Sequence, residues 1–183
     1  MSFCLINSIN FKHNIKVVSK YIDINKIAFV IKNNAYGHGL VEMARLANES
    51  GIKHAIVISS EEAKLVEGFF DTILVLSDIS NISKSKKIRI AINDLESINK
   101  IPGSTLVELK VDTGMHRNGI HINDLDRALE DVIKSNIMPA LEGLERNELK
   151  CLMLKAQEVL GQDHGISNTL EKMVDSPGLS VFG

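Results

Sequence analysis

Cysteine is scarce in this sequence of 183 residues, where only Cys4 and Cys151 occur. The two form neither a CxxC pair nor a metal-ligand spacing, and they lie far apart along the chain. A disulfide scaffold is therefore excluded, and we expect both residues to be reduced, buried thiols with no metal and no catalytic role.

Long apolar runs and clustered charge are also missing. No apolar stretch approaches the roughly 20 residues that a membrane-spanning helix needs, and residues 1–7 hold no basic region before their short apolar run. The formal net charge is −2 and the basic residues are scattered, which argues against nucleic acid or an anionic membrane as a partner. We expect a cytoplasmic protein with a small-molecule ligand.

Proline is rare as well, with three residues and no low-complexity linker, so the length predicts one domain. Runs rich in isoleucine and valine recur, and they are continuous rather than alternating. Such runs are typical of parallel strands covered on both faces. The expected strands lie near residues 27–31, 54–58, 72–76, 88–92, 105–111 and 137–141.

Helical patterns separate several of these runs. Ser59 and Asn93 are each followed three residues later by a glutamate, which is a helix start signal. Residues 123–135 place apolar side chains on one face, as in an amphipathic helix that covers a sheet. Alternating strands and helices predict an α/β fold of βα repeats, wound into either an open parallel sheet or a barrel.

The most informative segment follows the first apolar run, where Lys32 precedes Asn33-Asn34-Ala35-Tyr36-Gly37-His38-Gly39. A partly desolvated amine at the end of an apolar strand can attack a carbonyl and could hold an aldehyde cofactor. A lone lysine there more often only extends its amine into water. Two glycines around a histidine, however, suit a tight functional loop better than a routine connection.

A second segment of this kind follows the fifth expected strand, from Glu108 to Gly119, and contains Lys110, Asp112 and Arg117. In βα proteins the carboxyl ends of the strands form the ligand face. An arginine at that end can bind a carboxylate or phosphate with two hydrogen bonds. The alternative is a solvated loop with an ordinary ion pair.

Together the two segments resemble the barrel domain of alanine racemases, fold-type III enzymes that depend on pyridoxal phosphate. In that family the first strand ends in a lysine followed by Ala-Tyr-Gly-His-Gly, and the fifth ends in Lys-x-Asp-Thr-Gly-Met-x-Arg. Both patterns are intact here, and the resemblance runs from about residue 3 to 143. It implies a TIM-type βα barrel across residues 1–183, with 144–183 divergent and shortened by a deletion, and with the family's C-terminal β domain absent.

The resemblance also implies site roles. Lys32 would bind pyridoxal phosphate as a Schiff base and act as one catalytic base, and Tyr36 would contact the cofactor phosphate. Arg117 would hold the substrate carboxylate or the phenolic oxygen of the cofactor, while Lys110, often carbamylated in the family, would orient that arginine. His38 would have a mainly structural role in its loop.

Beyond residue 143 the resemblance is fragmentary. The resemblance implies that Asn168 and Thr169 would approach the cofactor phosphate, together with the amides of Gly178 and Leu179. A short Ser/Asn segment is more commonly only a helix cap.

Three departures from the family pattern predict weak or absent racemase activity in this chain. Residues 144–146 replace a segment whose histidine supports the cofactor ring. Ser176 aligns with the arginine that faces the pyridine nitrogen. The chain stops at Gly183, before the domain that carries the tyrosine acting as the opposite base in a homodimer.

The expected function is interconversion of L- and D-alanine, which supplies D-alanine for peptidoglycan. A different class of protein is the noncatalytic, single-domain pyridoxal phosphate carrier, which would explain the short length but does not share both motifs in this form. A third alternative is a degenerate product without a stable site, whose exposed strand edges would favour association.

Overall fold

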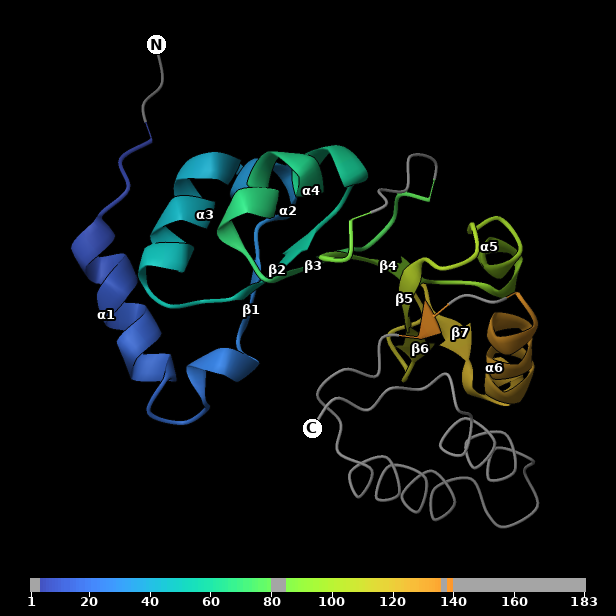
Figure 1. Ribbon diagram of the computed structural model, residues 1–183. Coiled ribbons are helices and arrows are strands. Elements are labelled where there is room, and N and C mark those ends of the chain that lie inside the picture. The colour runs from blue at the N-terminus through green and yellow to red at the C-terminus, as the bar shows by residue number, and fades with distance from the viewer. Residues whose placement is uncertain (1–3, 80–84, 136–137, 140–183) are drawn as a thin grey trace. The chain divides into compact units, whose positions relative to one another are not determined.

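The computed structural model describes residues 4–79, 85–135 and 138–139. The chain divides into two compact units, Met1–Ala91 and Ile92–Gly183, whose elements are labelled in Figure 1. Each unit is described by itself.

A parallel sheet forms the centre of the first unit. Its order is β1 (Ala28–Val30), β2 (His54–Val57), β3 (Thr72–Val75) and β4 (Ile88–Ile92), the last of which continues into the second unit. The register aligns Phe29 with Ala55, Ala55 with Ile73, and Ile73 with Ile88. All four strands lie within the apolar runs that predicted them.

Two helices cover one face of this sheet (Figure 1), namely α3 (Leu40–Glu49) and α4 (Ser60–Val66). They bury short side chains such as Ala44 and Ala63, which allows the helices to pack closely on the strands. The hydroxyl of Ser59 accepts a hydrogen bond from the Glu62 amide at 3.2 Å and so begins α4, as the sequence predicted. A short 3₁₀ helix, Glu67–Phe69, follows.

The other face of β2 and β3 is only partly covered in the described part of the chain. Ala55, Val57, Ile73 and Val75 are buried, whereas the residues between them are half-buried. The two faces of these strands are therefore buried to different extents in the described part of the chain. The buried face is the one that packs under the helices.

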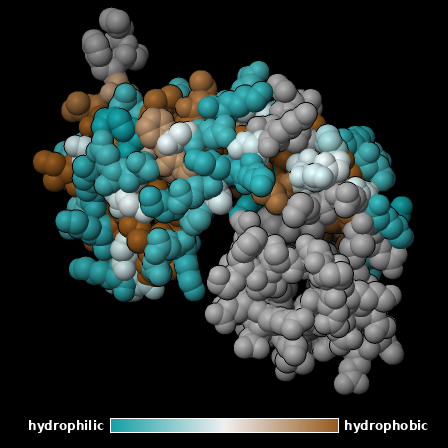
Figure 2. Space-filling model, viewed as in Figure 1, coloured by the Kyte–Doolittle hydropathy of each residue, from teal (hydrophilic) through white to brown (hydrophobic). Residues whose placement is uncertain are grey.

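Helix α1 (Ser8–Val18) lies outside this core and contains no buried residue. It is attached by an edge contact between the Phe11 and Phe29 rings, 5.5 Å between centroids, and by an ion pair from Lys12 to Glu49 at 3.2 Å. Ile9 remains 79% exposed, and Figure 2 shows hydrophobic side chains on the surface over α1. A 3₁₀ helix, Ile24–Lys26, leads from α1 into β1.

The described part of the second unit holds two pairs of strands. β5 (Leu106–Leu109) pairs in parallel with β8 (Met138–Pro139), and β6 (Val111–Asp112) pairs with β7 (Ile120–His121). Helix α6 (Leu125–Lys134), which follows the 3₁₀ helix Ile122–Asp124, buries Ala128, Leu129 and Val132. The predicted amphipathic helix is therefore confirmed.

Two details of the sequence prediction are wrong. Helix α5 (Leu95–Ile98) is capped by Asp94 rather than Asn93, because the Asp94 carboxylate accepts from the Ser97 amide at 2.8 Å. Cys4 is exposed instead of buried, and Cys151 lies outside the described residues. Among the helices of the described part, none is long and apolar enough to cross a membrane.

Candidate active site

Lys32 lies where β1 ends. The amide of Ile31 still donates to the Ile56 carbonyl at 2.9 Å, so the ladder between β1 and β2 extends up to the lysine. The Lys32 side chain is half-buried. This is the position that the sequence predicted, at the carboxyl end of a parallel strand.

The chain then makes a left-handed turn. Asn33, Asn34, Ala35 and Tyr36 have φ between 52° and 55°, and Gly37 follows with φ 89°. A left-handed helical conformation costs roughly 1–2 kcal/mol per non-glycine residue, with asparagine tolerating it best. The segment α2 (Lys32–Tyr36) is thus a strained turn, and such strain persists only where surrounding contacts hold it.

The turn brings two predicted site residues together. The Lys32 Nζ atom lies 6.0 Å from the centroid of the Tyr36 ring, at the outer limit of a cation–π contact. Tyr36 is 61% exposed. A primary amine and a phenol are therefore presented by one short segment at one end of the sheet.

His38 bonds within the same loop. Its Nδ1 atom lies 2.9 Å from the Ala35 carbonyl oxygen, and its amide donates to the same oxygen at 3.1 Å. These contacts support the structural role that the resemblance implies for His38.

Asn34 is the centre of the turn. Its side-chain oxygen accepts from the Leu40 amide at 2.8 Å, its carbonyl accepts from the Gly39 amide at 3.0 Å, and its own amide donates to Glu62 Oε1 at 2.8 Å. Sequence reasoning missed both Asn34 and this contact of Glu62. The Ser59-x-x-Glu62 signature located the glutamate, but only as part of a helix start.

In the second unit, Lys110 lies between β5 and β6 with its main chain fixed on both sides. Its amide donates to the Ile92 carbonyl at 3.0 Å, and its carbonyl accepts from the Ile120 amide at 2.7 Å. The Lys110 amine donates to Asn118 Oδ1. Arg117 is exposed, so its guanidinium is accessible within this unit.

Asp112 organises the loop that leads to Arg117. Its Oδ1 atom accepts from the amides of Gly114 and His116, each at 3.0 Å. These two hydrogen bonds, with a smaller contribution from the His116 imidazole, hold the pKa of Asp112 below its ordinary value. The carboxylate thus stays ionised and continues to accept from both amides.

The remaining predicted site residues, Asn168, Thr169, Gly178 and Leu179, lie outside the described residues. The described part contains no cluster of three or more His, Cys, Asp or Glu side chains that could hold a metal ion.

Comparisons with known proteins agree on one family. Residues 6–144 match the family model for the alanine racemase N-terminal domain. The alanine racemase of a Nitratiruptor species is 41% identical over 131 residues, which are 71% of this chain and 39% of that protein. The chain therefore spans about two-fifths of the length of the curated relatives that it matches.

Solved structures show the fold. The alanine racemase from Corynebacterium glutamicum superposes with a TM-score of 0.63 at 18% identity, over 88% of this chain and 52% of that one. A histidine racemase from Leuconostoc mesenteroides gives a TM-score of 0.62 at 21% identity, over 95% of this chain and 48% of that one. The described strands and helices thus have the α/β barrel-type fold of these N-terminal domains.

Proposed function

This chain belongs to the family of alanine racemase N-terminal domains, and on that premise we propose that it binds pyridoxal phosphate through Lys32 and acts in the interconversion of L- and D-alanine. The observation that carries the proposal is the placement of Lys32 at the end of β1, beside Tyr36 and on a strained turn. Strain of this kind is concentrated at functional sites.

The chemistry of the residues present fits the cofactor. The Lys32 amine would hold the cofactor covalently through its aldehyde. The exposed Tyr36 phenol can donate a hydrogen bond to the phosphate. Arg117, with its accessible guanidinium, binds the substrate carboxylate, and Lys110 supports the loop that carries it.

The cofactor, when bound, withdraws electrons from the amino acid's Cα and makes its proton removable near neutral pH. Lys32 Nζ, when not bonded to the cofactor, would be free to act as a base. Lys32 Nζ would take and return the Cα proton on its side of the substrate. Racemisation also requires a proton donor on the opposite face.

Alanine as the substrate is supported by the family match and by the curated relatives, since the fold alone is shared with a histidine racemase. We extend the proposal to a cytoplasmic homodimer whose D-alanine serves peptidoglycan synthesis. This extension follows from the family rather than from a contact in the structure.

Proton exchange at the alanine Cα separates a catalyst from a cofactor carrier. The chain is incubated with pyridoxal phosphate and L-alanine in D₂O, and deuterium at Cα is followed by NMR. We expect exchange that falls at least about 100-fold in Lys32→Ala, the lower bound for loss of a positioned base. Cofactor binding at Lys32 without any exchange would instead favour the noncatalytic carrier.

A further inference from the structure

Glu62 connects two neighbouring strand ends of the first unit through one carboxylate. Its Oε1 atom accepts from the Asn34 amide at 2.8 Å, in the turn after β1. Its Oε2 atom accepts from the Ile58 amide at 3.0 Å, directly after β2. Each oxygen therefore holds a different loop, and only a forked acceptor can do both.

This contact differs from the ordinary role of a glutamate at this point of a helix. In a capping box the glutamate in the first turn accepts from the amide of the capping residue itself, which here is Ser59. Glu62 instead reaches the residue before the cap and a second loop 28 positions earlier in the chain. Glu62, the glutamate of the helix-start signature, therefore makes a tertiary contact instead of the capping-box hydrogen bond.

The hydrogen bond to Glu62 comes from the strained left-handed turn. Asn34 is the second residue after Lys32 and has φ 55°. Its carbonyl and side chain bond to Gly39 and Leu40, close by in the chain, whereas its amide bonds to Glu62 on another element. Glu62 therefore links the left-handed turn to α4 through a hydrogen bond to the main chain.

We propose that Glu62 is the positioning residue for Lys32: its carboxylate holds the left-handed turn in the conformation that presents the Lys32 amine to an aldehyde cofactor. This inference rests on the proposed binding of pyridoxal phosphate to Lys32. Glu62 touches neither the cofactor nor the substrate, and it acts through the main chain of Asn34.

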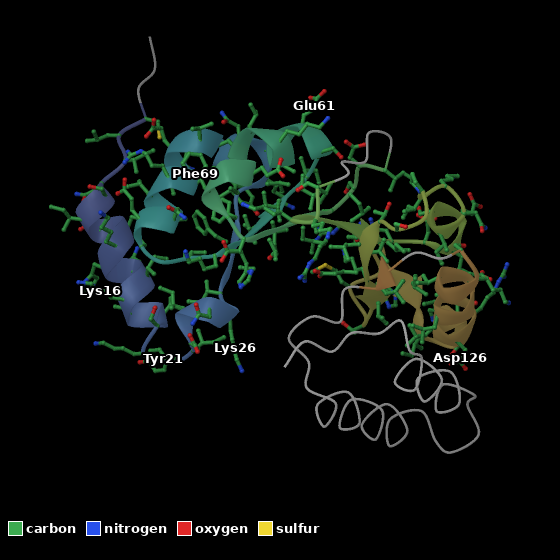
Figure 3. The ribbon with its side chains drawn as sticks, viewed as in Figure 1. Lys16, Tyr21, Lys26, Glu61, Phe69 and Asp126 are labelled. Carbon is green, nitrogen blue, oxygen red and sulfur yellow. The ribbon has the colours of Figure 1, made fainter. Side chains whose placement is uncertain are left out.

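Two substitutions of Glu62 test the pair of hydrogen bonds that its carboxylate accepts. A substitution of the neighbouring Glu61 is the control. Glu62→Gln replaces one acceptor oxygen with an NH₂ group, which would face a main-chain N–H. Glu62→Asp keeps the charge but shortens the side chain by one methylene. Glu61→Gln removes the same charge from the same helical turn, where Glu61 projects from α4 into solvent (Figure 3).

The assay is borohydride trapping of pyridoxal phosphate, followed by peptide mass spectrometry. Labelling of Lys32 is expressed relative to Lys16, an exposed lysine on α1 (Figure 3), and only the folded fraction from gel filtration is scored. We expect this ratio to fall at least about tenfold in Glu62→Gln and Glu62→Asp, as for loss of a hydrogen bond to a charged group. The Glu61→Gln ratio should match that of the unchanged chain.

Each outcome decides between the two proposals. A ratio in both Glu62 variants equal to that of the unchanged chain overturns the positioning role and leaves the cofactor site at Lys32 intact. An unchanged chain that is not labelled preferentially at Lys32 overturns the proposed function, and the positioning role with it. A general loss of stability would lower the thermal midpoint without changing the ratio in the folded fraction, and that result also overturns the positioning role.

Discussion

The Lys32 amine lies 6.0 Å from the centroid of the Tyr36 ring. The left-handed turn between the two residues brings their side chains close together. Both side chains leave the same short segment, which follows directly on β1. In the proposed function, the aldehyde and the phosphate of the cofactor would both be held by this one segment, Lys32–Tyr36.

Tyr36→Phe removes the hydroxyl and keeps the aromatic ring, so it tests the role of the hydroxyl alone. We expect the Kd for pyridoxal phosphate, from spectroscopic titration, to rise about tenfold, because the phosphate loses one hydrogen bond while the ring beside Lys32 is retained. Tyr36→Ala removes both and should weaken binding further. A Kd for Tyr36→Phe equal to that of the unchanged chain would show that the phenol does not contact the phosphate.

A side chain at Gly119 would clash with the main chain of β6, whereas one at Gly114 would not, so Gly114 is the control. Both have strongly positive φ, 127° and 121°, but a Cβ on Gly119 would lie 2.8 Å from the Asp112 main-chain nitrogen, whereas one on Gly114 would meet nothing within 4 Å. We expect Gly119→Ala to lower the free energy of unfolding by about 1–3 kcal/mol more than Gly114→Ala. Urea unfolding measures both, and equal losses would contradict the close approach of β6 and β7.

We expect the stability of the loop at Asp112 to depend on pH. Because the Gly114 and His116 amides lower the pKa of Asp112 in the folded chain, the stabilisation is complete above the ordinary carboxyl pKa of about 4 and is lost as the pH falls through the lower folded value. An NMR titration of the Asp112 carboxyl carbon should give a midpoint below about 4.

Asp112→Asn is the control for that titration, since its amide oxygen still accepts from Gly114 and His116 but does not titrate. Hydrogen exchange at the Gly114 amide should become faster at low pH in the unchanged chain, beyond the intrinsic pH effect, and should lack this extra change in Asp112→Asn. An Asp112 midpoint at or above about 4 would contradict the two hydrogen bonds.

The elements of the fold were predictable because each depends on local sequence. The apolar runs located all four strands of the first unit, and the Ser59 cap located α4. The cap of α5 was misassigned to Asn93 because adjacent Asn and Asp side chains are both good caps, and only their geometry selects Asp94.

The details of the site were less predictable. The position of Lys32 follows from the end of an apolar run, but four successive non-glycine residues in a left-handed turn contradict local preference. That turn bonds to Glu62, a residue 28 positions away in the chain, through the Asn34 amide. Features such as this turn depend on packing between segments that are far apart in the sequence, so local sequence patterns do not predict them.

The central claim is tested most directly by identifying the lysine that carries the cofactor. The chain is mixed with equimolar pyridoxal phosphate, reduced with borohydride and digested, and the labelled peptides are identified by mass spectrometry. We predict that the label lies mainly on Lys32, and that in Lys32→Ala the characteristic absorbance is lost and only weak labelling of exposed lysines remains. Equal labelling and absorbance in Lys32→Ala and the unchanged chain would contradict the account.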